Sequence, residues 1–364
     1  LSSLSASGTV TGLLLDGANS RNGTAPDEKT QYANAAFRML NNNGSGKAGS
    51  AYLPGGIGGI AGFYSVSFSA GAGLTNAAAV RGNMLTGGVA GSLMKAGLAS
   101  SDLNGNANGK LIELAALTNT GLVRCTADYN GAKDIHAGQF AGGISGYAVC
   151  IKLTACKSSP SNTGKAAYIP AAATLTGQMK GDFVGGLVGY ATNLTLGSGT
   201  GTGSGYVLGH DFVGGFVGAG DNGGLAFTDV LTNGKTYTNA SSVLGHRYVG
   251  GITALFTDGT LEQFTNTGVV AGFADAADKI EKTNTAAYVG GIVGKCDGSL
   301  SSDGKAIPVI TECFNAVTDT GNRLYNQYSK LGASADYVGG IAGYFDFARM
   351  DETTETVPAA VMLV

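Results

Sequence analysis

The heptapeptide FVGGLVG, residues 183–189, places two adjacent glycines inside a stretch of aromatic and aliphatic residues. A glycine in a strand costs about 0.5–1 kcal/mol relative to alanine and brings no side chain to the core. The pattern nevertheless recurs, as YVGGIVG at residues 288–294 and as YVGGIAGY at residues 337–344. An unfavourable feature that returns along the chain indicates an architectural role.

Eight copies of this motif can be aligned, beginning about 40 residues apart on average but at irregular intervals. Their paired glycines are Gly58 and Gly59, Gly87 and Gly88, Gly142 and Gly143, Gly185 and Gly186, Gly214 and Gly215, Gly250 and Gly251, Gly290 and Gly291, and Gly339 and Gly340. The first two copies lack the leading aromatic residue. We interpret these glycines as structural repeat positions.

A second element follows several copies, at residues 111–121, 261–270 and 310–321. In each, apolar and polar residues alternate and the stretch ends in Asn, Thr and Gly. This pattern predicts a half-buried strand followed by a turn. Each repeat is therefore expected to contain two or three short strands.

One such repeat cannot bury its apolar face alone, so neighbouring repeats must stack on it. Stacked strands lie about 4.8 Å apart, and a Cβ atom does not fit where another backbone passes close by. We therefore expect the Gly-Gly pairs at such approaches, or at positions of positive φ. The sequence predicts an all-β fold, a parallel β-solenoid or β-helix of about eight Gly-Gly repeats with a short N-terminal helix.

An eight-bladed β-propeller is the alternative architecture. The shortest intervals, from Gly58 to Gly87 and from Gly185 to Gly214, leave little room for four strands and their turns. The solenoid is therefore the preferred prediction.

Three regions are expected along the chain. Residues 1–54 form an N-terminal cap region, in which the helical spacing of apolar residues over 27–40 predicts a short helix. Residues 55–346 form the solenoid, and residues 347–364 form a tail or edge strand that ends in the apolar stretch Val357–Val364. The first residue is Leu1 rather than methionine, which suggests a piece processed from a longer precursor.

Composition narrows the functional classes. The 364 residues include 62 glycines, 43% apolar residues and only 13% charged residues, which is too apolar for a disordered chain. The net charge is −3 and no basic run occurs, so nucleic acid is not an expected partner. No apolar stretch reaches the 18 or so residues of a membrane-spanning helix.

The five cysteines, Cys125, Cys150, Cys156, Cys296 and Cys313, form no CxxC pair, which disfavours a zinc site. Their spacing is compatible with two local disulfides, Cys150 with Cys156 and Cys296 with Cys313, in an oxidising compartment. The alternative is that they are reduced cysteines buried in a core of small residues.

The histidines His136, His210 and His246 have no partner at metal-ligand spacing, and we interpret them as turn residues. His210 and His246 both stand just before a Gly-Gly motif, where they could also stack on adjacent coils.

Three aspartates, Asp182, Asp211 and Asp336, each precede the leading aromatic residue of a motif. Stacked carboxylates can bind calcium or act as an acid/base pair. Arg247 and Ala287 interrupt this series, so solvated turns are expected, with calcium as the minor alternative and no other cofactor.

Other motifs carry little chemistry. The glycine run at residues 197–205 is not followed by GKS or GKT and is predicted to be a flexible loop rather than a phosphate loop. No catalytic residue is expected, because no Gly-x-Ser-x-Gly elbow has credible partners. Asn-x-Ser/Thr sequons occur at Asn22, Asn43, Asn193 and Asn239, although chance explains them equally well in this composition.

The stretch YVGGIVG at 288–294, followed by residues 310–321 with their Cys-Phe-Asn and Thr-Gly ending, resembles the GLUG repeat of bacterial cell-surface proteins. That family includes adhesins and non-catalytic regions of secreted IgA-cleaving proteases. The resemblance covers residues 55–346, and it implies a surface location, a β-solenoid-like body and no catalytic residues.

These observations together predict a non-enzymatic, extracellular structural or adhesive protein of a microbial surface. It would be a stiff rod whose loops, residues 148–180 and 191–209, contact a host or matrix ligand or other copies of the chain. Two alternatives remain: a filament subunit joined by exchange of the strand Val357–Val364, and a β-helical polysaccharide lyase or hydrolase, which would need paired carboxylates.

Overall fold

The computed structural model describes a series of segments whose regular elements are all β-strands. These segments are residues 4–11, 56–66, 70–71, 73–82, 85–96, 111–125, 140–159, 183–203, 205–209, 212–226, 237–245, 247–257, 259–272, 287–298, 308–316, 324–326 and 336–346. The expected helix at 27–40 and the tail at 347–364 lie outside them.

The strands form four stacks, which we call sheets 1 to 4. Sheet 1 contains β1 (Leu4–Ala6), β6 (Leu74–Asn76), β11 (Thr118–Asn119), β15 (Lys157–Ser158), β18 (Gly201–Thr202), β22 (Tyr237–Asn239), β27 (Phe264–Asn266) and β32 (Phe314–Asn315). Sheet 2 contains β4 (Ala61–Val66), β5 (Ala70–Gly71), β9 (Ala90–Lys95), β10 (Ile112–Ala115), β14 (Ser145–Thr154), β17 (Val188–Leu196), β21 (Val217–Ala226), β25 (Thr253–Phe256), β26 (Gly259–Glu262), β30 (Val293–Asp297), β31 (Val309–Thr311) and β35 (Ala342–Asp346).

Sheet 3 carries the first half of each Gly-Gly motif. It contains β3 (Ile57–Gly58), β8 (Thr86–Gly87), β13 (Phe140–Gly142), β16 (Phe183–Gly185), β20 (Phe212–Gly214), β24 (Tyr248–Gly250), β29 (Ala287–Gly290) and β34 (Asp336–Gly339). Sheet 4 is interrupted: one part contains β2 (Thr9–Thr11), β7 (Ala79–Gly82) and β12 (Val123–Cys125), and the other contains β19 (Tyr206–Leu208), β23 (Ser242–Gly245), β28 (Val270–Gly272) and β33 (Leu324–Asn326).

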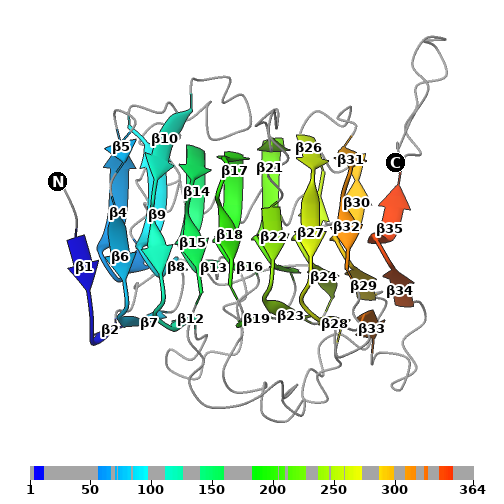
Figure 1. Cartoon of the computed structure of the whole chain (residues 1–364), viewed down its shortest axis with the longest axis horizontal. Helices are drawn as coiled ribbons and strands as arrows, with labels where there is room; N and C mark the ends of the chain where they lie inside the picture. The colour runs from blue at the N-terminus through cyan, green and yellow to red at the C-terminus, as the bar shows by residue number, and fades with distance from the viewer. Residues whose placement is uncertain are drawn as a thin grey trace, which may run out of the picture.

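Successive repeats stack in parallel and in register (Figure 1). Phe183 pairs with Phe212, and Phe212 pairs with Tyr248, so equivalent residues of each motif form a column along the stack. In a propeller each blade would be a separate sheet, whereas here every sheet takes strands from many repeats. The predicted parallel β-solenoid is therefore confirmed, and a coil such as the one from β16 to β19 contributes a strand to each sheet.

The first glycine of each pair allows the sharp corner between sheets 3 and 2. A Cβ on Gly185 would lie 1.9 Å from the carbonyl oxygen of Val188 and 2.7 Å from that of Phe216 in the next coil. Such approaches exclude every side chain. The described paired glycines do not have positive φ, so close backbone approach is the part of the prediction that holds.

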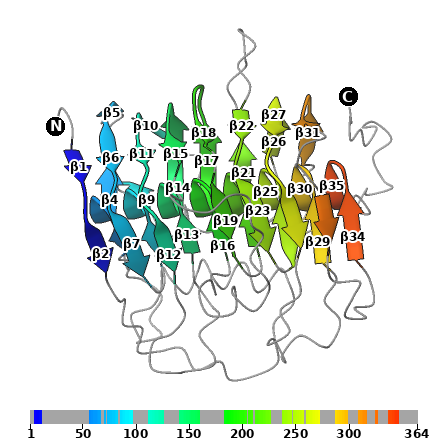
Figure 2. The ribbon, with the colours of Figure 1, turned by 60° about the horizontal axis from the view of Figure 1, so that its bottom comes forward.

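The third glycine of the motif brings sheets 2 and 3 together. A Cβ on Gly189 of β17 would lie 2.7 Å from the amide nitrogen of Ala141 in β13. Ala254 occupies the same place after Gly250 and is fully buried, so one coil accommodates a methyl group there. The turned view in Figure 2 shows the sheets overlying one another along the stack.

Sheet 3 lies between sheets 2 and 4, and side chains on both of its faces are packed against these neighbours. The aromatic residue of each motif packs towards sheet 2, where the rings of Phe212 and Tyr248 stack at 4.5 Å and those of Tyr248 and Tyr288 at 5.0 Å. The next residue, such as Val213, packs against valines of sheet 4 such as Val243. Alternation along a strand thus fills two separate apolar clusters.

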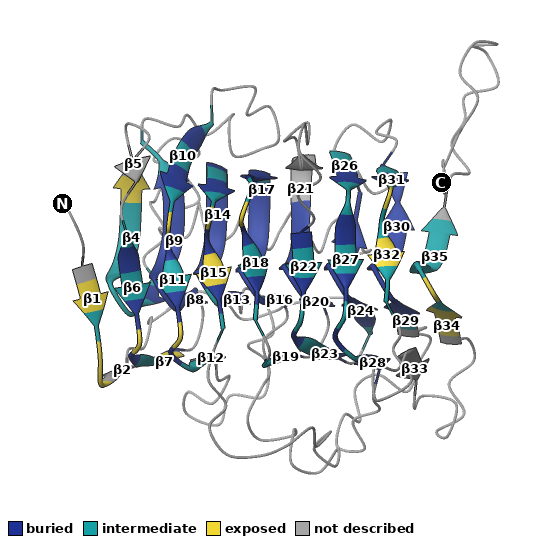
Figure 3. Ribbon diagram, viewed as in Figure 1, coloured by how far each residue is buried: buried dark blue, intermediate teal, exposed yellow. Residues whose placement is uncertain are grey.

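The main core lies between sheets 1 and 2 and runs the length of the stack (Figure 3). Leu114, Leu153 and Leu196 of sheet 2 are fully buried in it, as are Leu117 and Phe264 beside sheet 1. Each coil covers the apolar face of its neighbour, which is how a chain with short strands builds one continuous core.

The corner between sheets 2 and 1 is a left-handed residue, which the sequence reading missed. The residues at this place include Gly73, Ala116, Ala155, Gly199, Gln263 and Glu312, all with positive φ. In the stretches at 111–121, 261–270 and 310–321 the corner residue is not glycine. The sequence of each stretch therefore predicts one continuous strand. Each is in fact broken at this corner.

We expect Ala116→Gly to stabilise the protein by about 0.5–1 kcal/mol, because it removes the steric cost of a left-handed alanine. Ala116 is exposed, so no packing is lost. Ala115→Gly, one residue earlier in β10, is the matched control and should destabilise. Urea unfolding of both variants measures this, and a loss of stability in Ala116→Gly would contradict it.

The solenoid begins earlier than the expected boundary at residue 55. β1 pairs with β6 and β2 pairs with β7, so residues 4–11 already belong to the stack. Residues 4–11 of the expected N-terminal cap region therefore contribute strands to sheets 1 and 4.

Candidate functional site

A column of buried side chains runs along the inner edge of sheet 1, at the turn towards sheet 4. Its members in register are Asn76, Asn119, Ser158, Thr202, Asn239, Asn266 and Asn315. Where two asparagines are adjacent in the column, Nδ2 of one donates to Oδ1 of the next, at 2.8 Å from Asn76 to Asn119, 2.8 Å from Asn239 to Asn266 and 2.9 Å from Asn266 to Asn315. We call this set the Asn column.

Four asparagines of the column also hold their own turns: Asn76, Asn119, Asn239 and Asn266. Asn239 Nδ2 donates to the carbonyl of Ser241 at 3.0 Å, and Asn239 Oδ1 accepts from the backbone N–H of Ser241 at 3.1 Å. Asn266 makes the same two bonds with Gly268. Because buried polar groups are expensive unless they are paired, this satisfaction in two directions makes asparagine uniquely suited to the position.

In every motif except the last, the second glycine packs directly against this column. A Cβ on Gly251 would lie 2.0 Å from the carbonyl oxygen of Gly291 and 2.6 Å from Cγ of Asn266. A Cβ on Gly88 would lie 2.3 Å from Cγ of Asn119. The Gly-Gly motif and the Asn column therefore contact each other directly.

The column is interrupted in the middle, where Ser158 and Thr202 replace asparagine. Thr202 Oγ1 donates to Asn239 Oδ1 at 2.6 Å, but Ser158 Oγ is buried and has no hydrogen-bond partner among the described residues. A short side chain here leaves Asn119 without the neighbour that Asn76 and Asn266 have.

Ser158→Asn is expected to stabilise the protein by about 1–2 kcal/mol, because it adds one or two buried hydrogen bonds and removes an unsatisfied hydroxyl. The midpoint of denaturant unfolding measures the effect. Ser158→Ala is the control that removes the hydroxyl without extending the column. A lower midpoint for Ser158→Asn would show that Gly143, which faces Ser158, leaves no room for the amide.

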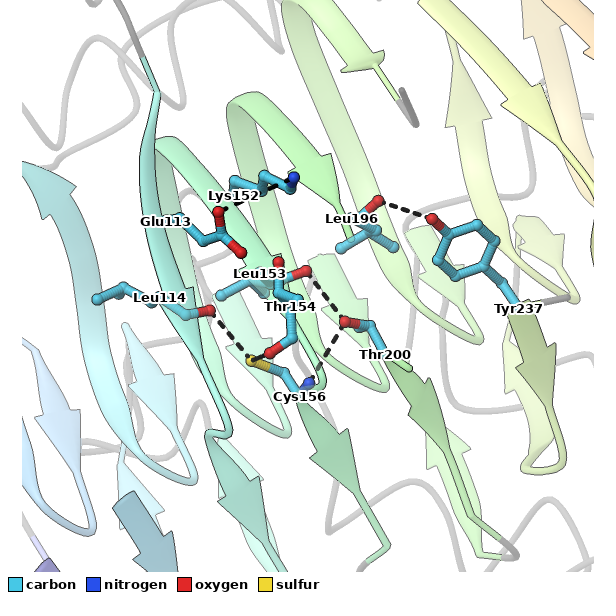
Figure 4. Close-up of polar contacts among 9 residues, drawn as sticks. All are labelled: Glu113, Leu114, Lys152, Leu153, Thr154, Cys156, Leu196, Thr200 and Tyr237. Atoms are coloured by element: carbon cyan, nitrogen blue, oxygen red, sulfur yellow. Dashed lines mark hydrogen bonds and ion pairs between the residues drawn. The ribbon is translucent and has the colours of Figure 1, made fainter. Parts of the chain in front are cut away.

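Cys156 lies at the sheet 2 to sheet 1 corner, in a position where other coils place leucine or phenylalanine (Figure 4). Its Sγ donates to the carbonyls of Leu114 at 3.6 Å and Thr154 at 3.4 Å. Its backbone N–H donates to Thr200 Oγ1 of the next coil. The thiol is therefore a buried core group that satisfies corner carbonyls.

The structure does not pair Cys150 with Cys156 or Cys296 with Cys313. Cys150 belongs to the aromatic cluster between sheets 2 and 3, whereas Cys156 belongs to the main core, so a strand separates them. Cys296 lies in β30 of sheet 2, whereas Cys313 lies at the corner between β31 and β32, and both contact the main core. Cys125 ends β12, and its side chain lies outside the described residues.

Burial raises the pKa of the Cys156 thiol to about 12 and that of Cys313 to about 11, from an ordinary value of 9.0. Below pH 9 both thiols are protonated whether the chain is folded or unfolded. Above pH 9 the unfolded chain loses these protons first, so the free energy of unfolding falls as the pH rises, by up to about 1.4 kcal/mol per pH unit for each thiol.

Cys156→Ser replaces the thiol with a hydroxyl, which still donates a hydrogen bond but does not titrate in this range. The variant should therefore lose less stability between pH 8 and pH 10 than the parent chain. Chemical denaturation at the two pH values measures the difference. An equal loss of unfolding free energy in both proteins would contradict a raised pKa of the buried Cys156 thiol.

A buried ion pair interrupts the apolar cluster between sheets 2 and 3. Lys295 Nζ lies 3.1 Å from Asp297 Oδ2, and their side chains are 8% and 4% exposed. The ammonium also lies 5.5 Å from the ring centroids of Tyr288 and Tyr344. The aspartate is thus held by a lysine within aromatic surroundings, as a structural pair is.

The predicted titratable positions are only partly described. His136, His210, His246, Asp182 and Asp211 lie outside the described residues, and so do the sequons at Asn22 and Asn43. The backbone of Asp336 begins β34 and pairs with Ala287. Within the described segments, no group of three or more His, Cys, Asp and Glu residues is placed to hold a metal ion.

The two described sequons are poor modification sites. Asn239 is fully buried in the Asn column. Asn193 lies at a bulge in β17 with φ of 54°, and its Nδ2 donates to Cys150 Sγ at 3.7 Å. The sequon at Asn239 is therefore a consequence of the column rather than a glycosylation signal.

The expectation of protruding loops at 148–180 and 191–209 is wrong for the described parts. Residues 148–158 belong to β14 and β15, and residues 191–209 contain the end of β17, all of β18 and all of β19. The glycine run at 197–205 is likewise not a flexible loop: Thr200 and Thr202 are 4% and 7% exposed, and both take places in the coil. Residues 160–182 lie outside the described part.

The Asn column was missed by the sequence reading, although a signal exists. The dipeptide Thr-Asn recurs at residues 75–76, 118–119, 238–239 and 265–266. Taken locally, this dipeptide indicates only a turn, because the hydrogen-bond partner of each asparagine lies in another repeat.

Among the described residues, no helix is long and apolar enough to cross a membrane. Comparisons with protein-family models, with curated proteins and with solved structures found no match to the chain.

Proposed function

We propose that the chain is a non-enzymatic structural or adhesive protein of a microbial cell surface, a stiff rod that displays binding segments. The proposal rests on the resemblance to GLUG repeats and on one structural observation. The register of sheet 3 is unbroken from β13 to β34, although the segments that join it to the previous strand differ greatly in length.

Two connections into sheet 3 illustrate this tolerance. Residues 246–247 join β23 to β24, whereas residues 159–182 join β15 to β16. The aromatic residue that follows, Tyr248 or Phe183, nevertheless enters the same column. A body that keeps its register whatever is inserted at a corner is suited to carrying variable segments for recognition.

The test uses the purified chain on immobilised fibronectin, collagen, mucin and a panel of polysaccharides. The proposal expects retention on at least one surface without release of soluble sugar. Replacing residues 160–182 by a short Gly-Ser linker, or residues 126–139 as a second variant, should lower retention about tenfold in at least one case while the unfolding midpoint stays unchanged. Release of sugar, or no retention on any surface, would overturn the proposal.

A further inference from the structure

Among the described residues, the C-terminal end of the stack is an open edge. β32, β33 and β34 are the last strands of sheets 1, 4 and 3, and β31 pairs only with β26. All three exposed large hydrophobic residues of the described part lie here: Phe314 in β32 is 59% exposed, and Tyr337 and Val338 in β34 are 38% and 47% exposed. Figure 3 shows the yellow of exposed residues on β32 and β34.

The glycines mark the same edge. In the interior coils the second glycine meets the backbone of the next coil, as Gly251 meets Gly291. A Cβ on Gly340, the equivalent residue of the last coil, would meet nothing within 4 Å. The last coil therefore has the shape that receives a neighbour, without a described neighbour on it.

A second copy of the chain fits this edge poorly. Its N-terminal coil would bring Ala6 to the place of the Asn column, because Ala6 pairs with Asn76. It would bring Gly56 to the aromatic place, because Gly56 precedes Ile57, which shares its place with Ala141. Neither residue could extend the Asn column beyond Asn315 or the ring stack beyond Tyr337.

The chain's own residues 357–364 match the edge better. The sequence IPVITECF at 307–314 supplies β31, the corner and the start of β32. VPAAVMLV at 357–364 has its proline at the same place, and its Ala360 and Leu363 align with Ile310 and Cys313. Pro308 follows Asp297 at nearly the same chain distance at which Pro358 follows Asp346, and these two aspartates are partners in register.

We propose that residues 357–364 add to β31 and β32 of the same chain as the next rung of the solenoid. Ala360 then lies beside Ile310, Val361 beside Thr311, and Leu363 follows Cys313 in the core column that holds leucine in two other coils, at Leu74 and Leu117. Val364 covers part of Phe314. The segment carries no charged residue.

Cross-linking tests the register. Thr311→Cys with Val361→Cys, in a Cys313→Ser background, places two thiols side by side on the outer face of sheet 2. Thr311→Cys with Ala360→Cys is the matched control, because residue 360 faces the core. Mild oxidation should give an intramolecular disulfide in the first variant only, identified by peptide mass and unchanged on dilution.

Three results would overturn the proposal: no disulfide in either variant, equal disulfides in both, or dimers that disappear on dilution, which would place the segment on a second copy. A measurement that needs no new thiol supports the same conclusion. Deleting residues 357–364 should raise the hydrogen-exchange rates of the β31 amides about tenfold, while those of β17 stay unchanged. Unchanged β31 rates would contradict the proposal.

Discussion

Replacing Gly251 with alanine is expected to lower the free energy of unfolding by about 3–5 kcal/mol. The new methyl group would lie 2.0 Å from the carbonyl oxygen of Gly291 in the next coil and 2.6 Å from Cγ of Asn266. Neither group can move alone, because the carbonyl belongs to a corner backbone and Asn266 is held in the Asn column. The coil must therefore separate from its neighbour or deform.

Gly340→Ala is the matched control, since Gly340 holds the same place in the last coil and its Cβ meets no atom within 4 Å. Its effect should stay within about 0.5 kcal/mol. Denaturant unfolding followed by circular dichroism measures both variants. If the two cost the same, the penalty would come from the backbone conformation of the motif, and the contact between coils would not explain the second glycine.

Asn239→Asp should lower the free energy of unfolding by about 3–5 kcal/mol at pH 7. The change keeps the shape of the side chain but removes its amide hydrogens. A buried carboxylate oxygen would then face the carbonyl of Ser241 at 3.0 Å and Oδ1 of Asn266 at 2.8 Å, where Nδ2 now donates. Two hydrogen bonds become two repulsive contacts with no water to relieve them.

Asn315→Asp tests the direction of the Asn column. Asn315 accepts from Asn266 through Oδ1, an interaction that a carboxylate keeps, and no described residue accepts from its Nδ2. We therefore expect a loss below about 1 kcal/mol. Comparable losses at 239 and 315 would show that the hydrogen bonds along the column do not set the stability of these positions.

The repeat and its strands could be predicted because their signals are local. A position that excludes Cβ selects glycine in each copy, so the motif at 183–189 can be recognised without knowing what it touches. The aromatic residue before the glycines and the aliphatic residues around them likewise indicate a buried strand. The parallel solenoid followed from these features and from the need of each repeat for a neighbour.

The corner residues could not be found in the same way. A left-handed residue is recognisable when it is glycine, as at Gly199, but Ala116 and Gln263 adopt the same conformation because the stacked coils impose it. For this reason the alternating stretches at 111–121, 261–270 and 310–321 each predict a single strand, and the glycine run at 197–205 predicts a loop. Packing between coils overrides local preference at both places.

The amino-acid sequence by itself determined the all-β class, the repeat and the columns of apolar residues, because each depends on the size and spacing of side chains within one copy. Only the tertiary structure decided that the second glycine faces an asparagine, that Cys150 and Cys156 lie in different cores, and that the last coil ends in an open edge. These are contacts between residues of separate coils, and they exist only once the register of the stack is set.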